Sequence, residues 1–318
     1  MTFSSLVKKE IYTAFGAANA DARHCRVAML SAIIASGARV KTQVKTGSEN
    51  LCNLKVVLAA ENRYLLRTFY DICRNDFQAV LHGQKSEGKI RSLSLEKEDE
   101  GIKILGVVGL WNENTGFERK IGSLALRGDC CRRAYLAGTL LTCGYLSDPE
   151  SMYHAEFRVN DPKYARELVD FFKSFGLNAH MFSRKDRRTR LIYFKDGEQI
   201  SEILRITGAH EALMRFENAR ILKSLGNKIN RSANFDAANV DKAISAAVKQ
   251  IESINLIKGG LGLNSLPPGL EELARLRLKY PEMSLTELGE MLNPSLSKSG
   301  VNHRLRKLKE IADRLGDG

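Results

Sequence analysis

The sequence lacks any apolar run long enough to cross a membrane. Its longest nearly apolar stretches, residues 27–35 and 134–141, are about half the roughly 20 residues that a membrane span requires. Lys8, Lys9 and Glu10 interrupt the apolar residues near the amino terminus, so this segment has no continuous signal-peptide core. We therefore expect neither a membrane contact nor export, and we expect a cytoplasmic protein.

Cysteine is scarce and irregularly spaced. The six cysteines, at positions 25, 52, 73, 130, 131 and 143, form no Cys-x-x-Cys pair and follow no regular interval. This spacing indicates neither a zinc site nor a disulfide framework. We expect reduced, buried thiols, no bound metal and no cofactor.

Proline is also rare, with 6 residues in 318, whereas 43% of the residues are hydrophobic and 27% are charged. This composition is typical of a folded globular protein, and the length suits two or three domains. Lys and Arg number 49 against 37 Asp and Glu, which gives a net charge of +12. Such a surplus favours a polyanionic partner such as nucleic acid.

An internal repeat is present in the first two thirds of the chain. Residues 29–37 align without gaps to residues 136–144, and both are apolar helical stretches that end in a glycine suited to a helix C-cap. Residues 104–109 similarly resemble residues 203–208. Small residues share one face of each helical stretch: Ser31, Ala32 and Ala35 in the first, and Gly138, Thr139 and Thr142 in the second. Small residues alone could simply fill a crowded core, but the repetition favours two helices that pack on each other across a pseudo-twofold axis.

Similar helix and strand patterns follow each repeated helix. The predicted elements are strands 54–59, 79–83 and 90–95 with helix 62–73 in the first repeat, and strands 153–159, 177–183 and 189–194 with helix 162–175 in the second. Asp161 and Pro162 suit the start of that last helix, and Gly176 its end. Two α+β units in tandem are therefore expected.

After residue 208 the pattern changes to long helices. Residues 211–225 and 240–254 are predicted as connecting helices, and residues 258–268 as a Gly- and Pro-rich linker. Three shorter helices follow, at 270–279, 285–292 and 298–315. A short helix pair followed by a basic helix is the helix-turn-helix pattern of DNA-binding proteins.

The last helix is the candidate recognition helix. Val301, Leu305, Leu308, Ala312 and Leu315 form one apolar stripe that must face the domain core. No acidic residue occurs from 297 to 309. The candidate DNA contacts on the opposite side are Lys298, Ser299, Asn302, His303, Arg304, Arg306 and Lys307. The preceding helix adds Ser284, Thr286 and Glu287. The alternative is the solvated cationic face of an ordinary helix.

A second basic cluster lies in the turn between strands 177–183 and 189–194. It consists of Arg184, Lys185, Arg187, Arg188 and Arg190, which could contact phosphates or simply make a soluble loop. A metal-dependent nuclease instead needs converging carboxylates. The repeated helices end in Ser36 and Cys143, so we expect no catalytic residues there.

The repeated helices resemble the LAGLIDADG motif of homing endonucleases, most clearly in YLAGTLLTCGYL at residues 135–146. In that family each motif helix ends in an acidic, metal-binding residue, and the matching positions here are Ser36 and Cys143. More specifically, the chain resembles the WhiA family of bacterial sporulation and cell-division regulators. Residues 209–217, 227–234, 284–289 and 297–307 carry this resemblance. It implies a catalytically silent endonuclease-like domain joined to a helix-turn-helix, with a role in transcription, cell division, chromosome segregation or sporulation.

The predicted fold is α+β: tandem pseudo-twofold LAGLIDADG-like αββαββ repeats followed by an all-α helix-turn-helix domain. The predicted boundaries are 1–110 and 111–218 for the repeats, 219–265 for connecting helices and linker, and 266–318 for the helix-turn-helix. The predicted partner is double-stranded DNA in the nucleoid, with another transcription regulator or RNA polymerase as a further candidate. Two alternatives remain: an endonuclease that uses Asp129 or Glu156, and an adaptor whose repeat domain binds protein.

Overall fold

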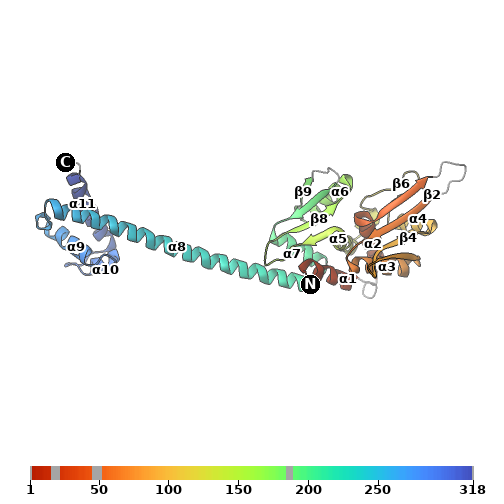
Figure 1. Cartoon of the computed structure of the whole chain (residues 1–318), viewed down its shortest axis with the longest axis horizontal. Coiled ribbons are helices and arrows are strands. Elements are labelled where there is room, and N and C mark those ends of the chain that lie inside the picture. The colour runs from red at the N-terminus through yellow and green to blue at the C-terminus, as the bar shows by residue number, and fades with distance from the viewer. Residues whose placement is uncertain (1, 16–21, 45–51, 184–188, 317–318) are drawn as a thin grey trace. The chain divides into compact units, whose positions relative to one another are not determined.

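The computed structural model describes residues 2–15, 22–44, 52–183 and 189–316 (Figure 1). The chain forms two compact units, Met1–Lys223 and Ser224–Gly318. Helix α8 (His210–Gly260) begins in the first unit and ends in the second. Among the described residues no helix is both long and apolar enough to cross a membrane. The finer division into four parts remains a prediction.

The first unit contains two copies of one arrangement. The first copy comprises α2 (Arg23–Gly37), β1 (Arg39–Val44), β2 (Cys52–Ala59), α3 (Arg63–Phe77), β3 (Leu81–Ser86), β4 (Lys89–Leu95) and α4 (Glu98–Val107). The second comprises α5 (Asp129–Cys143), β7 (Gly144–Leu146), β8 (Ala155–Val159), α6 (Pro162–Lys173), β9 (His180–Ser183), β10 (Arg190–Phe194) and α7 (Gly197–Ile206). Their antiparallel sheets have equivalent strand orders, β1-β2-β4-β3 and β7-β8-β10-β9. The predicted duplication is thus confirmed, with one further helix closing each copy.

Three further parts of the first unit lie outside the two copies. They are α1 (Phe3–Phe15), the hairpin β5 (Trp111–Asn112) and β6 (Gly116–Phe117), and a 3₁₀ turn, η1 (Ser123–Leu126). The sequence did not predict α1, although Phe3, Val7 and Ile11 are buried on one side of it. Four-residue spacing of this kind is typical of an amphipathic helix.

Local signals set the ends of several elements. The Asp161 side chain accepts hydrogen bonds from the backbone N–H groups of Lys163 and Tyr164, so it caps α6 as predicted. Gly176 ends that helix region with a φ of +76°. The equivalent glycines at the ends of the two copies, Gly109 and Gly208, have φ values of +77° and +72°. Only glycine adopts this conformation without strain, which explains why the repeat retains it.

Helices α2 and α5 pack directly against each other at the centre of the unit (Figure 1). The closest approach is at Gly138, where an added Cβ would lie 2.7 Å from the Met29 carbonyl oxygen and 3.0 Å from the Cβ of Ala32. Continuous buried stretches, Val27 to Ala35 and Ala134 to Leu141, coincide with the two apolar runs of the sequence. A helical stretch that is apolar on all sides is expected to be buried on all sides, and these two stretches are buried along their whole length.

The expected glycine C-cap is confirmed in one of the two helices. Gly144 caps α5 in an extended conformation, and its backbone N–H donates to the Leu140 carbonyl oxygen. Gly37 is instead the last helical residue of α2, and Ala38 is the C-cap. Crowding also restricts both positions: a Cβ would lie 2.4 Å from Thr142 Cγ2 at Gly37 and 2.6 Å from the Leu140 carbonyl oxygen at Gly144. Ser31 ties α2 to the end of α4, since its hydroxyl donates to the Val108 carbonyl at 2.9 Å.

The second unit is all helical. Its elements are α9 (Pro268–Lys279), α10 (Leu285–Glu290), α11 (Lys298–Gly316), a 3₁₀ turn η2 (Leu263–Ser265) and the end of α8. Ile254 and Ile257 of α8 join the buried cluster formed by these helices. The predicted pair of connecting helices and part of the predicted linker are therefore wrong, because residues 210–260 form one helix that runs into this core.

We predict that Gly138→Ala lowers the free energy of unfolding of the first unit by about 1–3 kcal/mol, the range typical of an overpacked core. Trp111 is the only tryptophan and packs against the core of this unit, so its fluorescence during urea denaturation reports this unit. Gly106→Ala in α4 is the matched control, because a Cβ there meets nothing within 4 Å and the change should stabilise slightly. Equal stabilities for Gly138→Ala and the wild type would contradict the close helix contact.

Candidate nucleic-acid interface

Helix α11 separates an apolar side from a basic side. Val301, Leu305, Leu308 and Ala312 are at most 4% exposed and lie in the core of the second unit, while Leu315 is partly buried against it. The stripe predicted from the sequence thus faces the core. Because these positions are occupied by packing, the opposite side of α11 is the side that can contact a partner.

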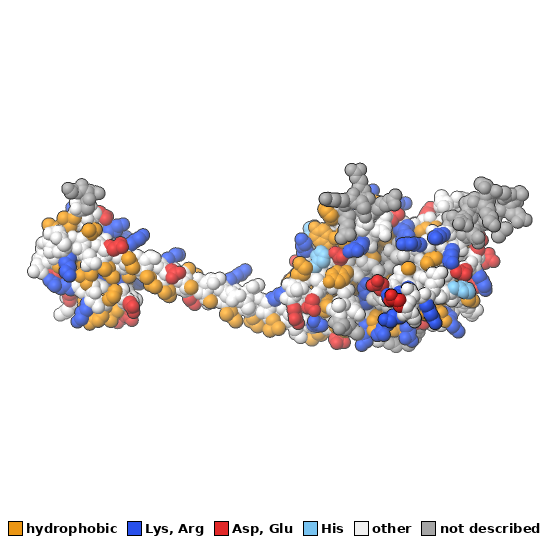
Figure 2. Space-filling model, viewed as in Figure 1, with side chains coloured by type: hydrophobic (Ala, Val, Ile, Leu, Met, Phe, Trp, Pro, Cys, Tyr) orange, Lys and Arg blue, Asp and Glu red, His pale blue; other side chains and the backbone are white. Residues whose placement is uncertain are grey.

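The exposed side of α11 holds cations without acidic partners. Within residues 189–316, no ion pair engages the exposed charges of Lys298, Arg306, Lys307 or Lys309. Ser299, Asn302 and His303 are exposed on the same helix. Lys and Arg side chains are spread over the visible face of each unit (Figure 2), so the net charge alone locates no DNA site. On α11 the unpaired cations lie beside neutral hydrogen-bonding side chains, on the exposed side of the helix that follows α10 in helix-turn-helix order.

Arg304 differs from the other predicted contacts on α11. It is half-buried, and its Nη1 donates to the carbonyl oxygen of Gly269 at 2.9 Å. The guanidinium therefore ties α11 to the first turn of α9. This contact gives Arg304 a structural role in positioning α11, and its DNA contact remains a prediction.

The predicted contacts on α10 are also partly used by the fold. The Ser284 hydroxyl accepts from the backbone N–H of Glu287, and the Glu287 carboxylate accepts from the backbone N–H of Ser284 at 2.8 Å. This capping box satisfies two N–H groups at the start of a helix of only 6 residues. The backbone hydrogen bond from Ser284 also lowers the pKa of Glu287. Thr286 is exposed and takes no part in the capping box.

The turn between α10 and α11 depends on close backbone contact. Leu296 N–H donates to the Gly289 carbonyl at 2.9 Å, and a Cβ at Gly289 would lie 2.2 Å from the Leu296 carbonyl oxygen. A side chain at position 289 would therefore push the recognition helix away from α10. Glycine at position 289 therefore allows the segment before α11 to pack closely on the end of α10.

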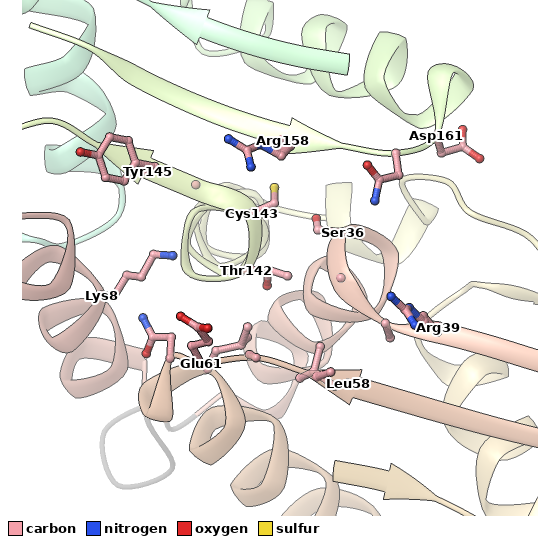
Figure 3. Close-up of a pocket in the computed structure, with 18 of the residues that line it drawn as sticks. Lys8, Ser36, Arg39, Leu58, Glu61, Thr142, Cys143, Tyr145, Arg158 and Asp161 are labelled. Carbon is pink, nitrogen blue, oxygen red and sulfur yellow. The ribbon is translucent and has the colours of Figure 1, made fainter. Parts of the chain in front are cut away.

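In the first unit, Ser36 and Cys143 line an open cavity of about 940 Å³ (Figure 3). Lys8 enters it from α1 and Arg158 from β8, on either side of the end of α5. Behind them Ser36 hydrogen-bonds to the hydroxyl of Tyr164 at 3.0 Å, and Tyr164 to that of Tyr135 at 2.8 Å. The positions that match the metal-binding acids of homing endonucleases thus hold neutral groups.

A cation occupies the end of α2 at this cavity. The guanidinium of Arg119 donates to the carbonyl oxygens of Ala35 and Ala38, the latter at 2.9 Å. Burial raises the pKa of the Cys143 thiol to about 11 and lowers the pKa of Lys8. A fixed positive charge repels a divalent ion, and a protonated thiol is a poor nucleophile. Neither metal-assisted nor cysteine chemistry is favoured here.

The carboxylates that line the cavity are largely engaged elsewhere. Asp161 caps α6, and Glu156 forms an ion pair with Arg158 at 3.3 Å and a hydrogen bond with His154 at 3.2 Å. Of the lining acids that the structure describes, this leaves Glu61. Asp129, the other acid considered for a nuclease, lies in the first turn of α5, at the opposite end of the helix from Cys143, and pairs with Arg132. These acids do not converge on one cation.

The second basic cluster lies mostly outside the described residues, which exclude Arg184, Lys185, Arg187 and Arg188. Arg190 is half-buried at the start of β10. The sequence also gave no reason to single out Lys8 and Arg119. Neither belongs to a motif, and their position at the two helix ends follows from packing between segments far apart in the chain.

Comparisons with known proteins find relatives of both units. The profile of the WhiA LAGLIDADG-like domain matches residues 132–225, and the profile of the WhiA C-terminal HTH domain matches residues 229–312. A relative named "Probable cell division protein WhiA" from Clostridium tetani is 40% identical over 326 residues, covering 99% of this chain and 98% of its own. Its namesake from Lachnoclostridium phytofermentans is 38% identical over 323 residues, covering 99% of each. A crystal structure of full-length WhiA from Thermotoga maritima has a TM-score of 0.57 at 22% identity and covers 99% of both chains, which shows a shared fold.

We predict that Ser284→Ala weakens α10 by about 1 kcal/mol, the usual cost of removing an N-cap hydroxyl. Amide hydrogen exchange of residues 285–290 in the full chain should then be about fivefold faster. Ser299→Ala in α11 is the matched control, and it should leave exchange in α10 unchanged. Unchanged exchange in Ser284→Ala would show that the capping box does not stabilise the helix-turn-helix.

Proposed function

The chain belongs to the WhiA family, and on this premise we propose that it is a non-enzymatic regulator of transcription that acts in cell division. Its second unit carries the helix-turn-helix DNA-binding domain of that family, and its first unit a degenerate LAGLIDADG-like fold. The relatives are named as cell division proteins, which supports this cellular role. The proposal extends to chromosome segregation and, in a sporulating host, to sporulation.

One observation carries the proposal: unpaired cations and neutral hydrogen-bonding side chains share the exposed side of α11. Arg306 and Asn302 have the donor and acceptor groups that recognise guanine and adenine edges in the major groove. Lys298, Lys307 and Lys309 flank them and suit phosphate contacts, which fix position without specifying sequence. Together they supply both parts of a specific DNA complex.

The first unit supports a second, non-catalytic contact. Lys8 and Arg39 line the open cavity, and Arg119 blocks the end of α2. A cavity with this charge suits a phosphate backbone better than a catalytic metal ion. We therefore propose DNA as the partner of this cavity, with a transcription regulator or RNA polymerase as the alternative partner.

We predict that Arg306→Ala and Lys307→Ala weaken DNA binding in different ways. Arg306→Ala should reduce discrimination between the target and a shuffled sequence by about 1–3 kcal/mol, because it removes a base contact. Lys307→Ala should lower affinity for both sequences and reduce the slope of log affinity against log salt by about 1. Fluorescence anisotropy over a salt series measures both effects, on fragments recovered by crosslinking the protein to chromosomal DNA.

Lys249→Ala is the matched control for these variants. Lys249 is an exposed lysine of α8 that lies outside the helix-turn-helix. Its removal should change neither discrimination nor the salt slope. Binding that is independent of salt, or equal losses in all three variants, would contradict the proposed role of α11.

We also predict that the full chain does not cleave its target fragments in the presence of Mg²⁺ or Mn²⁺. The helix ends offer Ser36, Cys143 and the Arg119 guanidinium in place of two carboxylates, so no metal-bound water forms there. Gel electrophoresis of supercoiled and linear target DNA detects even single nicks. Cleavage that disappears in Glu156→Gln would establish the nuclease alternative.

A further inference from the structure

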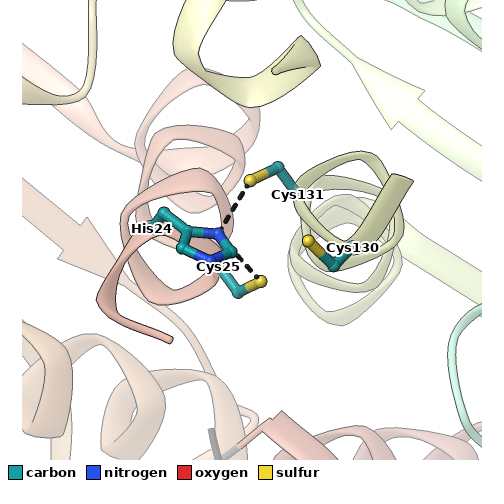
Figure 4. A group of neighbouring side chains, drawn as sticks. All are labelled: His24, Cys25, Cys130 and Cys131. Atoms are coloured by element: carbon teal, nitrogen blue, oxygen red, sulfur yellow. Dashed lines mark hydrogen bonds between the residues drawn. The ribbon is translucent and has the colours of Figure 1, made fainter. Parts of the chain in front are cut away.

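A cluster of metal-ligating side chains lies at the amino-terminal ends of α2 and α5, away from the Ser36 and Cys143 ends (Figure 4). Its members are His24, Cys25, Cys130 and Cys131, and their ligand atoms all lie within 4.8 Å of one another. The Nδ1 atom of His24 lies 3.1 Å from the sulfur of Cys131 and 3.3 Å from that of Cys25. The proposed DNA-binding function uses none of these side chains.

The pseudo-twofold axis brings the cluster together. His24 and Cys131 are 107 residues apart, which is also the offset that relates Met29 to Leu136 in the repeat. The two residues are therefore equivalent positions of the two copies and meet where α2 and α5 pack. The close contact at Gly138 holds the helices near enough for side chains from both first turns to converge.

Three thiols and an imidazole have the donor chemistry that zinc prefers in structural sites. Zinc–sulfur and zinc–nitrogen bonds of about 2.3 and 2.1 Å place neighbouring ligand atoms of a tetrahedron about 3.5–3.8 Å apart. The present separations lie on both sides of this range, so small rotamer changes suffice to close the site.

The mixture of exposed and buried ligands suits a site that an ion can reach from solvent and that then shields the ion. Cys25 and Cys131 are buried, whereas His24 and Cys130 are exposed. The structure describes all of these cysteines as free thiols. A disulfide would use two of the three sulfurs and leave the convergent imidazole without a role, whereas one four-coordinate ion uses all four ligands.

We propose that this chain binds one Zn²⁺ ion through His24, Cys25, Cys130 and Cys131, and that the ion fastens α2 to α5 at the pseudo-twofold axis. The ion would act as a structural cross-link between the two copies. Its ligands lie at the amino-terminal ends of α2 and α5, whereas Ser36 and Cys143 lie at the opposite ends. The ion would therefore not be a nuclease metal. Zinc binding at this site is independent of DNA binding, so absence of the ion would leave the proposed function unaffected.

Metal analysis of the full chain tests the proposal. Protein that is purified without a histidine tag or chelators should contain about one zinc ion per chain, as measured by inductively coupled plasma mass spectrometry. His24→Gln and Cys130→Ser alter exposed residues, so the fold should persist, and both variants should lose most of the zinc. Cys143→Ser is the matched control at the other end of α5 and should retain it. Zinc-free wild type, or equal zinc content in all variants, would overturn the proposal.

Cobalt substitution identifies the ligands directly. Co²⁺ in the metal-free wild type should produce tetrahedral visible bands and a thiolate charge-transfer band, both absent in Cys130→Ser. Removing the ion from the wild type should also lower the urea midpoint reported by Trp111, and added Zn²⁺ should restore it. Absence of the thiolate band, or an intramolecular disulfide between these cysteines found by mass spectrometry of freshly purified protein, would overturn the site.

Discussion

The close contact between α2 and α5 is the constraint on which the first unit depends. Gly138 leaves room for the backbone of α2, where any side chain would meet the Met29 carbonyl oxygen. The two copies of the fold share this contact as their axis, so it decides which residues meet at each end of the helix pair. At one end are Ser36 and Cys143, and at the other the cysteines and His24. The packing of α2 on α5 does not depend on which side chains lie at the helix ends, because the contact at Gly138 uses different residues.

Positive charge has two uses in this chain. Arg119 binds the carbonyl groups at the end of α2, and Arg158 pairs with Glu156, so these cations are parts of the first unit's structure. The cations on the exposed side of α11 have no such partners among the described residues. Paired charges contribute little to binding a polyanion, whereas unpaired ones release counterions from DNA. Net charge alone could not separate these roles, and the ion pairs do.

Where a signal was local, the sequence was sufficient. The start of α6 was predicted correctly from Asp161 and Pro162, and the end of its helical region from Gly176. The apolar stripe from Val301 to Ala312 faces the core as expected. Predictions from the sequence failed where contacts between distant residues determine the local structure. Gly37 was expected to cap α2, yet it is the last helical residue, and its close contact with Thr142 explains the glycine. Residues 211–225 and 240–254 were predicted as separate helices, whereas residues 210–260 form one continuous helix.

By itself the sequence determined the duplication, the α+β order of each copy, the helix-turn-helix and the loss of acids at Ser36 and Cys143. Each of these rests on periodicity, capping residues or residue identity within a short window. Only the tertiary structure decided that Arg304 serves the fold, that Arg119 lies at the end of α2, and that four metal-ligating side chains meet. These facts join residues 35 to 107 positions apart, and the packing of helices, not the spacing of letters, brings such residues within bonding distance.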